Sequence, residues 1–162
     1  MRRILALALA LPLVACMNTP MGPAAVQQTS QEFNMHTRFG RMEVAIQDVS
    51  DTYRAEFGRR HALWHNALHV TDAEVAALQM SGDEDADVVV RIGWYRVDQG
   101  DLLTTTVKQR WHRIVGHWRL DGEERLDGAI GILGEKVEIV TPDAPPVHAQ
   151  FPTVRLGGGS AN

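Results

Sequence analysis

The sequence predicts an α+β domain in which two N-terminal helices pack on an antiparallel sheet of about four strands. Three observations lead to this prediction. Apolar residues recur at helical spacing over residues 31–49 and 51–66, and strand-like alternation covers residues 87–95 and 103–112. Turn sequences separate the strand segments, as in a meander with one apolar face.

The first residues have the composition of an export signal. Arg2 and Arg3 precede an apolar run over residues 4–14, which is too short to span a bilayer because spanning needs about 20 apolar residues. A short membrane anchor or a buried helix is the alternative interpretation of this run. The run ends in the sequence Leu13-Val14-Ala15-Cys16.

This ending resembles the lipobox of bacterial lipoproteins. The resemblance implies that residues 1–15 are a signal peptide, that the Cys16 thiol receives diacylglycerol, and that the new amine is acylated. Two or more acyl chains anchor a protein stably, whereas one anchors it marginally. Cys16 is the only cysteine, so its lipidation would leave an exported domain without a reactive thiol. Met17, where inner-membrane lipoproteins often have Asp, favours the outer membrane.

The residues after the cysteine divide into a tether, a body and a tail. Residues 16–31 are expected to be a tether because they are rich in Pro, Gly, Thr, Ser and Gln. Residues 32–141 are expected to fold, since 44% of the chain is hydrophobic. Residues 142–162 are rich in Pro and Gly and are expected to be a disordered tail.

The two helices, over residues 31–49 and 51–66, are expected to form an αα-hairpin. Ser30 and Ser50 are the expected N-caps, because a serine hydroxyl accepts a hydrogen bond from an amide of the first turn. Gly40 weakens the middle of the first helix.

The sheet is expected to begin with an extended segment from about Leu68. The strand-connecting turns are expected at residues 81–85, 98–101 and 115–116. The strand after the last turn is expected to end at Asp121 and Gly122. A glycine-punctuated loop over residues 128–134 and a short edge strand over residues 136–140 complete the predicted body.

Two strand sequences, VKQRW at residues 107–111 and GHWRL at residues 116–120, resemble the late strands of the NTF2-like superfamily. The resemblance covers roughly residues 86–126 and implies a curved antiparallel sheet that wraps the helices into a cone. Members of the superfamily serve as enzymes, ligand binders and interaction modules, so it predicts architecture and not activity. The sequence RFGR at residues 38–41 and the Gly-Glu pair at 134–135 are similar to small uncharacterised myxobacterial-type lipoproteins.

Three tryptophans, Trp94, Trp111 and Trp118, lie on successive predicted strands, with Gln109 on the face of Trp111. They either build the core or line a pocket in the cone, because pockets are mostly apolar with few polar groups. The nearby titratable side chains fall on the opposite face by parity: Tyr95, His112 and His117. This parity counts against catalysis, so no catalytic residue is predicted.

Three histidines at four-residue intervals are weak candidate metal ligands: His61, His65 and His69. Imidazoles at positions i and i+4 of one helix share a face and could bind zinc or copper. Neither a second ligand type nor an HExxH motif accompanies them. Surface or packing histidines are the favoured interpretation, and no metal or other cofactor is predicted.

The charge of the chain excludes some functions. Removal of Arg2 and Arg3 with the signal would leave 14 basic against 20 acidic residues, a formal charge of −6. Nucleic acids and anionic lipids both require a basic surface, so neither is an expected partner by electrostatics.

The sequence therefore predicts an envelope lipoprotein that acts as a binding or interaction module, with an envelope protein or a small apolar ligand as partner. A cone-type isomerase or dehydratase is the alternative.

Overall fold

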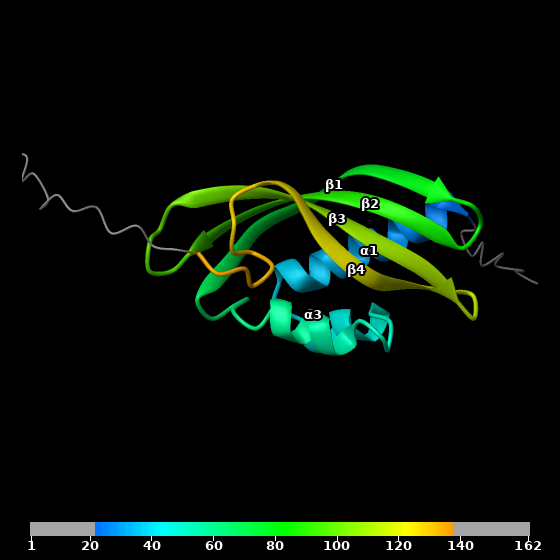
Figure 1. The fold of residues 1–162 in the computed structure, drawn as a ribbon, viewed down its shortest axis with the longest axis horizontal. Coiled ribbons are helices and arrows are strands. Elements are labelled where there is room, and N and C mark those ends of the chain that lie inside the picture. Colours follow the sequence, from blue (N-terminus) through cyan, green and yellow to red (C-terminus); the bar gives the residue numbers. More distant parts are fainter. Residues whose placement is uncertain (1–21, 138–162) are drawn as a thin grey trace, which may run out of the picture.

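A four-stranded antiparallel meander in the spatial order β1-β2-β3-β4 forms one layer of the molecule (Figure 1). This computed structural model describes residues 22–137. The strands are β1 (Leu68–Ser81), β2 (Asp85–Arg96), β3 (Leu102–Ile114) and β4 (His117–Gly128). The predicted α+β class, the sheet of about four strands and the extended segment from Leu68 are confirmed.

The helices lie on one face of this sheet, and their predicted boundaries are wrong (Figure 1). They are α1 (Pro23–Arg38), α2 (Met42–Ala45), the 3₁₀ turn η1 (Ile46–Asp48) and α3 (Arg54–Arg60). The second predicted helix, over residues 51–66, is thus reduced to a short α3. No helix within residues 22–137 is long and apolar enough to cross a membrane.

Helix α1 starts eight residues earlier than expected, so residues 23–31 belong to a helix and not to the tether. Pro23 is favourable at the first helical position, where its missing amide hydrogen is not needed. The buried stripe of α1 is largely polar, which hid its helical period in the sequence: Val26, Ser30, Phe33, Asn34 and Thr37.

Gly40 ends the first helix instead of weakening its middle. Its φ of 74° is left-handed, a conformation that glycine adopts without steric cost. A Cβ at this position would lie 2.9 Å from the His65 ring, so the close approach of that ring also requires glycine. The chain therefore turns here and continues as α2.

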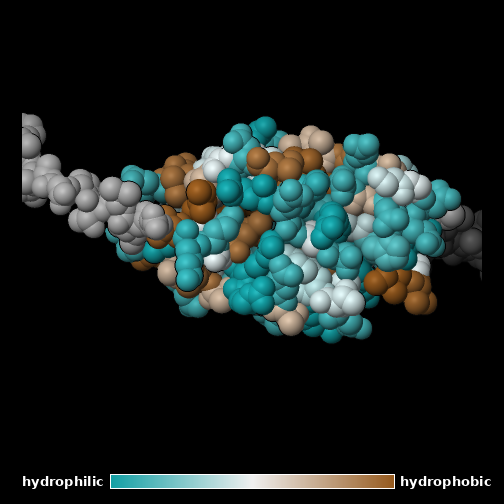
Figure 2. All heavy atoms as spheres, viewed as in Figure 1, coloured by the Kyte–Doolittle hydropathy of each residue, from teal (hydrophilic) through white to brown (hydrophobic). Residues whose placement is uncertain are grey.

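The molecular surface is mixed in polarity, with local apolar patches. Figure 2 shows a brown patch at the lower right, where Figure 1 places the turn between β3 and β4. Ile114 and Val115 of this turn are among the exposed large hydrophobic residues. The turn itself lies where the sequence predicted it.

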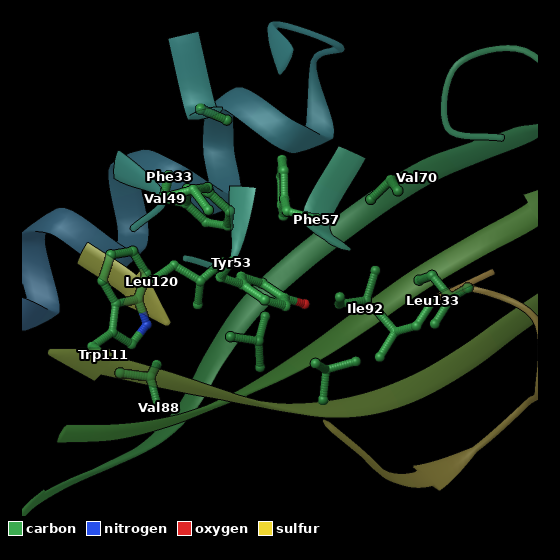
Figure 3. Packing of buried hydrophobic residues seen from close by; sticks show 14 of the residues in the cluster. Phe33, Val49, Tyr53, Phe57, Val70, Val88, Ile92, Trp111, Leu120 and Leu133 are labelled. Carbon is green, nitrogen blue, oxygen red and sulfur yellow. The ribbon is translucent and has the colours of Figure 1, made fainter. Parts of the chain in front are cut away.

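The core lies between the helices and the inner face of the sheet (Figure 3). Phe33 of α1 packs edge-on against Trp111 of β3, with ring centroids 5.5 Å apart, and lies 5.8 Å from Phe57 of α3. The inward residues of β2 alternate as predicted, and Ala86 extends the series toward the start of the strand: Val88, Val90, Ile92 and Trp94. The period of two therefore identified the buried face of the sheet correctly.

Strand β4 does not end at Asp121 and Gly122 but continues to Gly128. Residues 129–137 then fold back over the core, where Ile132 and Leu133 are buried. The indole Nε1 of Trp64 donates a hydrogen bond to the Ile132 carbonyl over 2.8 Å.

Several predictions fall partly or wholly outside residues 22–137. Residues 136–137 are not in a strand, and the remainder of the predicted edge strand lies outside the described residues. The predicted signal peptide, the lipidated Cys16 and the predicted tail over residues 142–162 also lie outside them.

Candidate functional site

A group of polar side chains is buried in the otherwise apolar core, and we call it the polar cluster: Asn34, Tyr53, His61, Gln109 and Glu123. Buried polar groups are costly unless they are hydrogen-bonded. The members come from α1, from both ends of α3, and from strands β3 and β4. The cluster therefore joins the helical layer to the sheet.

Glu123 reaches the core because of a β-bulge. Arg110 pairs with Gly122 and Trp111 with Leu120, so Asp121 is an extra residue in β4. Because side chains alternate with a period of two, one extra residue reverses the parity of those that follow. The bulge thus places Glu123 opposite Gln109 on the inner face.

The Glu123 carboxylate has three polar neighbours in the cluster. The Tyr53 hydroxyl donates to Oε2 over 3.1 Å, and Gln109 Nε2 donates to Oε1 over 3.5 Å. His61 Nε2 lies 3.3 Å from Oε2, and the two side chains are 1% and 2% exposed. Burial, and then the Glu123 carboxylate, raise the pKa of Tyr53 far above its ordinary value, so Tyr53 remains a neutral donor.

The His61 imidazole faces the Glu123 carboxylate inside the core. His61 Nδ1 lies 2.9 Å from the Phe57 carbonyl oxygen, which only accepts, so Nδ1 carries a hydrogen. His61 Nε2 lies within ion-pair distance of the Glu123 carboxylate, but the contact does not have the direction of a hydrogen bond.

Asn34 and Gln109 form a reciprocal amide pair that orients the cluster. Asn34 Nδ2 donates to Gln109 Oε1, and Gln109 Nε2 donates to Asn34 Oδ1, each over 3.0 Å. Asn34 Nδ2 also donates to the Ser30 carbonyl over 2.7 Å, which fixes the amide against α1. The pair holds Gln109 Nε2 toward Glu123.

Aromatic rings enclose the imidazole of the cluster. The ring centroids of Phe57 and Trp64 lie 4.1 and 4.5 Å from that of His61. The structure therefore holds an acid–base pair next to a hydroxyl donor, but in a closed site. A substrate would reach these groups only if the helical layer opened.

A surface groove lies beside the polar cluster, and we call it the charged groove. It encloses about 430 Å³ between α3, β4 and the 129–137 loop. Its lining is mostly charged: Glu56, Arg59, Arg60, Glu123, Glu124, Arg125, Leu133, Gly134 and Glu135. Arg60 connects the groove to the cluster, because its guanidinium donates to the Glu123 carbonyl over 2.7 Å and pairs with Glu56 over 2.8 Å.

Glu135 closes the loop that forms one wall of the groove. Its carboxylate accepts hydrogen bonds from the amides of Gly131 and Leu133 and from Arg125 Nε, each over 3.0 Å. Burial opposes ionisation, but these hydrogen bonds outweigh it and lower the pKa of Glu135. Arg59 is exposed and has no ion-pair partner within residues 22–137.

Of the three candidate metal ligands, His65 and His69 have ring centroids 6.2 Å apart, whereas His61 belongs to the polar cluster. Helix α3 ends at Arg60, so the premise that His61 and His65 share a helical face is wrong. His65 Nε2 donates to the Thr37 carbonyl over 2.7 Å at the end of α1, and His69 stacks on Tyr95 at 5.4 Å. Within the part of the chain that the structure describes, no three potential ligands are grouped for a metal.

The predicted pocket residues are buried among other side chains. Trp94 and Trp111 are 1% exposed, and Trp94 Nε1 donates to Thr105 Oγ1 over 2.9 Å. Trp118 is also buried, although it borders a shallow hollow beside α1. The tryptophans thus build the core, while Gln109 belongs to the polar cluster. The outward position of His112 is confirmed by its 2.8 Å ion pair with Asp85.

Comparisons with known proteins give a likeness of fold alone. No protein-family model and no curated protein matches the sequence. A SEC-C motif-containing protein from Rhodopseudomonas palustris superposes with a TM-score of 0.54 and 12% identity, over 65% of this chain and 82% of that chain. The intermembrane-space region of the chloroplast protein ARC6 gives 0.40 and 13% identity, over 66% and 98% of the chains. Neither likeness identifies an activity.

Proposed function

We propose that this chain is a lipid-anchored protein of the bacterial envelope whose α+β body is a binding module. The observation that carries the proposal is the sequence Leu13-Val14-Ala15-Cys16 at the end of a short apolar run. Fatty chains on Cys16 would hold the body at a membrane, with the outer membrane favoured by Met17.

The NTF2-like cone is part of the same proposal. A meander whose inner face is covered by α1 and α3 supports it, as do the inward Trp94 and Trp111. The interior of this cone is occupied by side chains of the core and of the polar cluster. We therefore place binding on the outside, at the charged groove.

The charged groove favours a polar partner over a small apolar ligand. Most of its acidic side chains are already paired with basic ones, whereas Arg59 is exposed and unpaired within the described residues. A guanidinium in this position suits a carboxylate of the partner. The proposed occupant is an acidic segment of an envelope protein.

The lipid anchor is tested by metabolic labelling with an alkyne fatty acid, followed by intact-mass analysis and membrane fractionation. The wild-type protein should carry the label, begin at Cys16 and sediment with membranes, and Cys16→Ala should be unlabelled and soluble. An unlabelled wild-type chain that retains its leader would overturn the anchor.

The groove is tested by photo-crosslinking in intact cells, with the crosslinking amino acid in place of Glu124, which lines the groove and leaves the Arg59 guanidinium intact. The control position is Arg91, which lies on the outer face of β2 and pairs with Glu74. We expect a reproducible envelope neighbour from position 124 and none from position 91. The same neighbours from both positions, or none from either, would argue against the groove.

A cone-type isomerase or dehydratase is the second candidate, and the polar cluster favours it. Proton abstraction needs a base within hydrogen-bond reach of the reacting group, and Tyr53, His61 and Glu123 supply a base and a donor. Histidine-labelled protein can be screened against small molecules by NMR. Compounds that shift the His61 signals in wild type, but not in Glu123→Gln, would support the enzyme.

A further inference from the structure

Two exposed apolar side chains lie at the turn between β3 and β4, one at the end of β3 and one in the turn itself. Val115 is 93% exposed and Ile114 is 42% exposed. The β3–β4 turn lies at the end of the molecule where α1 begins in Figure 1, and Figure 2 shows a brown patch at this end. We call these two residues the hairpin tip.

The backbone conformation at position 115 is unfavourable for valine. Val115 and Gly116 have φ values of 49° and 82°, the signs of a type I′ turn, in which Asn-Gly is preferred. A β-branched residue in the left-handed region is a steric outlier. Backbone strain of this kind is typical of functional sites. Asn would form the same turn without the strain, so the turn itself does not require valine.

The start of α1 lies beside the hairpin tip. Ala25 and Gln28 line a hollow of about 230 Å³ together with Gly116 and His117. A second hollow joins Gly22 and Pro23 to the β1–β2 turn and to Arg113. The chain therefore enters the folded body at the same end as the exposed apolar pair.

Chain length places this end near the membrane if Cys16 is lipidated. Seven residue steps separate Cys16 from Pro23, a distance of at most about 25 Å even when fully extended. The opposite turn, between β2 and β3, also exposes two apolar residues, Val97 and Leu102. The length of the 12-residue β2, about 40 Å, separates that turn from the end of the body at which α1 begins.

We propose that the hairpin tip inserts into the lipid surface in which Cys16 is anchored, so that the body docks with its α1 end on the bilayer. This inference rests on the proposed lipid anchor and adds an orientation to it. Two apolar side chains are a weak anchor alone, but an anchored chain presents them at high local concentration.

Charge near the tip indicates insertion rather than electrostatic adsorption. Arg113 and His112 on β3 lie next to acidic residues of the β1–β2 turn, and His112 pairs with Asp85 over 2.8 Å. The backbone amide of Arg113 donates to the Glu84 carbonyl over 2.7 Å. Among residues 22–137, this end carries both signs of charge and no polybasic patch, so docking should depend little on salt.

The experiment uses the mature lipidated protein in phosphatidylethanolamine–phosphatidylglycerol vesicles. Val115→Cys and, as the matched control, Leu102→Cys are labelled with the fluorophore NBD, since a lipidated Cys16 has no free thiol. We expect blue-shifted emission and quenching by spin-labelled lipid at position 115, and water-like emission without quenching at position 102.

The outcomes separate docking from anchoring. Vesicle flotation with no quenching at position 115, or equal quenching at both positions, would overturn the docked orientation and leave the anchor intact. A blue shift that depends on protein concentration and not on lipid would instead indicate a second copy as occupant. Failure to float would overturn the anchor and the inference together.

A second variant separates turn formation from docking. With the probe at Ile114→Cys, Val115→Asn should preserve or raise the thermal midpoint because Asn suits the turn. The same variant should lose quenching at position 114. Unchanged quenching in this variant would show that Val115 does not insert.

Discussion

At the scale of single residues, Glu123 is the side chain that most determines the interior. Its carboxylate contacts Tyr53, Gln109 and His61. A buried polar group that loses its partner is left uncompensated, and this costs more stability than the contact itself contributes.

Glu123→Ala should therefore lower the free energy of unfolding by about 3 kcal/mol, because it leaves buried partners unsatisfied. Glu123→Gln, which keeps the shape and an acceptor oxygen, should cost about 1 kcal/mol. Urea denaturation measures both. Glu124→Gln, at the exposed neighbouring position, is the control and should be close to wild type. Equal losses in the two Glu123 variants would contradict the argument.

Gly40 and Gly58 are two glycines at which alanine should have opposite effects on stability. Gly40→Ala should lower the free energy of unfolding by about 2 kcal/mol or more, because it forces alanine into a left-handed φ and against the His65 ring. Gly58 lies within α3 with open space around it, so Gly58→Ala should raise stability by up to about 1 kcal/mol. Thermal denaturation should move the two midpoints in opposite directions.

At the scale of elements, the 129–137 loop depends on the ionisation of Glu135. A carboxyl whose pKa is lowered by folding contributes stability above its unfolded value of 4.5 and loses it as pH falls through the folded pKa. In hydrogen exchange corrected for intrinsic rates, the amides of Gly131 and Leu133 should be protected near neutral pH and should lose this protection in acid. Glu135→Gln should weaken protection and abolish its pH dependence. A wild-type loop that stays protected in strong acid would refute this.

At the scale of the whole molecule, the loop after β4 belongs to the folded body. Ile132 and Leu133 are buried, and burial of such a side chain stabilises by roughly 1.5–3 kcal/mol. A chain that stops after Gly128 should therefore lose at least about 3 kcal/mol relative to one that stops after Val137. Urea midpoints of the two truncations test this, and equal midpoints would show that the loop is dispensable.

The sheet could be predicted more completely than the helices or the candidate site. Alternation along β2 and β3 identified the inward tryptophans because a period of two is a local property. Helix α1 was mislocated because Ser30, Asn34 and Thr37 occupy its buried stripe. Glu123 could not be predicted as a core residue, because alternation along the strand does not anticipate a bulge at Asp121.

Local sequence patterns are sufficient to predict the α+β class, the order of the strands and the face that the tryptophans occupy, because turns and alternation act between residues close in the chain. The tertiary fold was needed to show that four polar side chains meet in the core: Tyr53, His61, Gln109 and Glu123. Their meeting depends on the bulge in β4 and on contacts between segments far apart in the sequence, whose free energies no local pattern encodes.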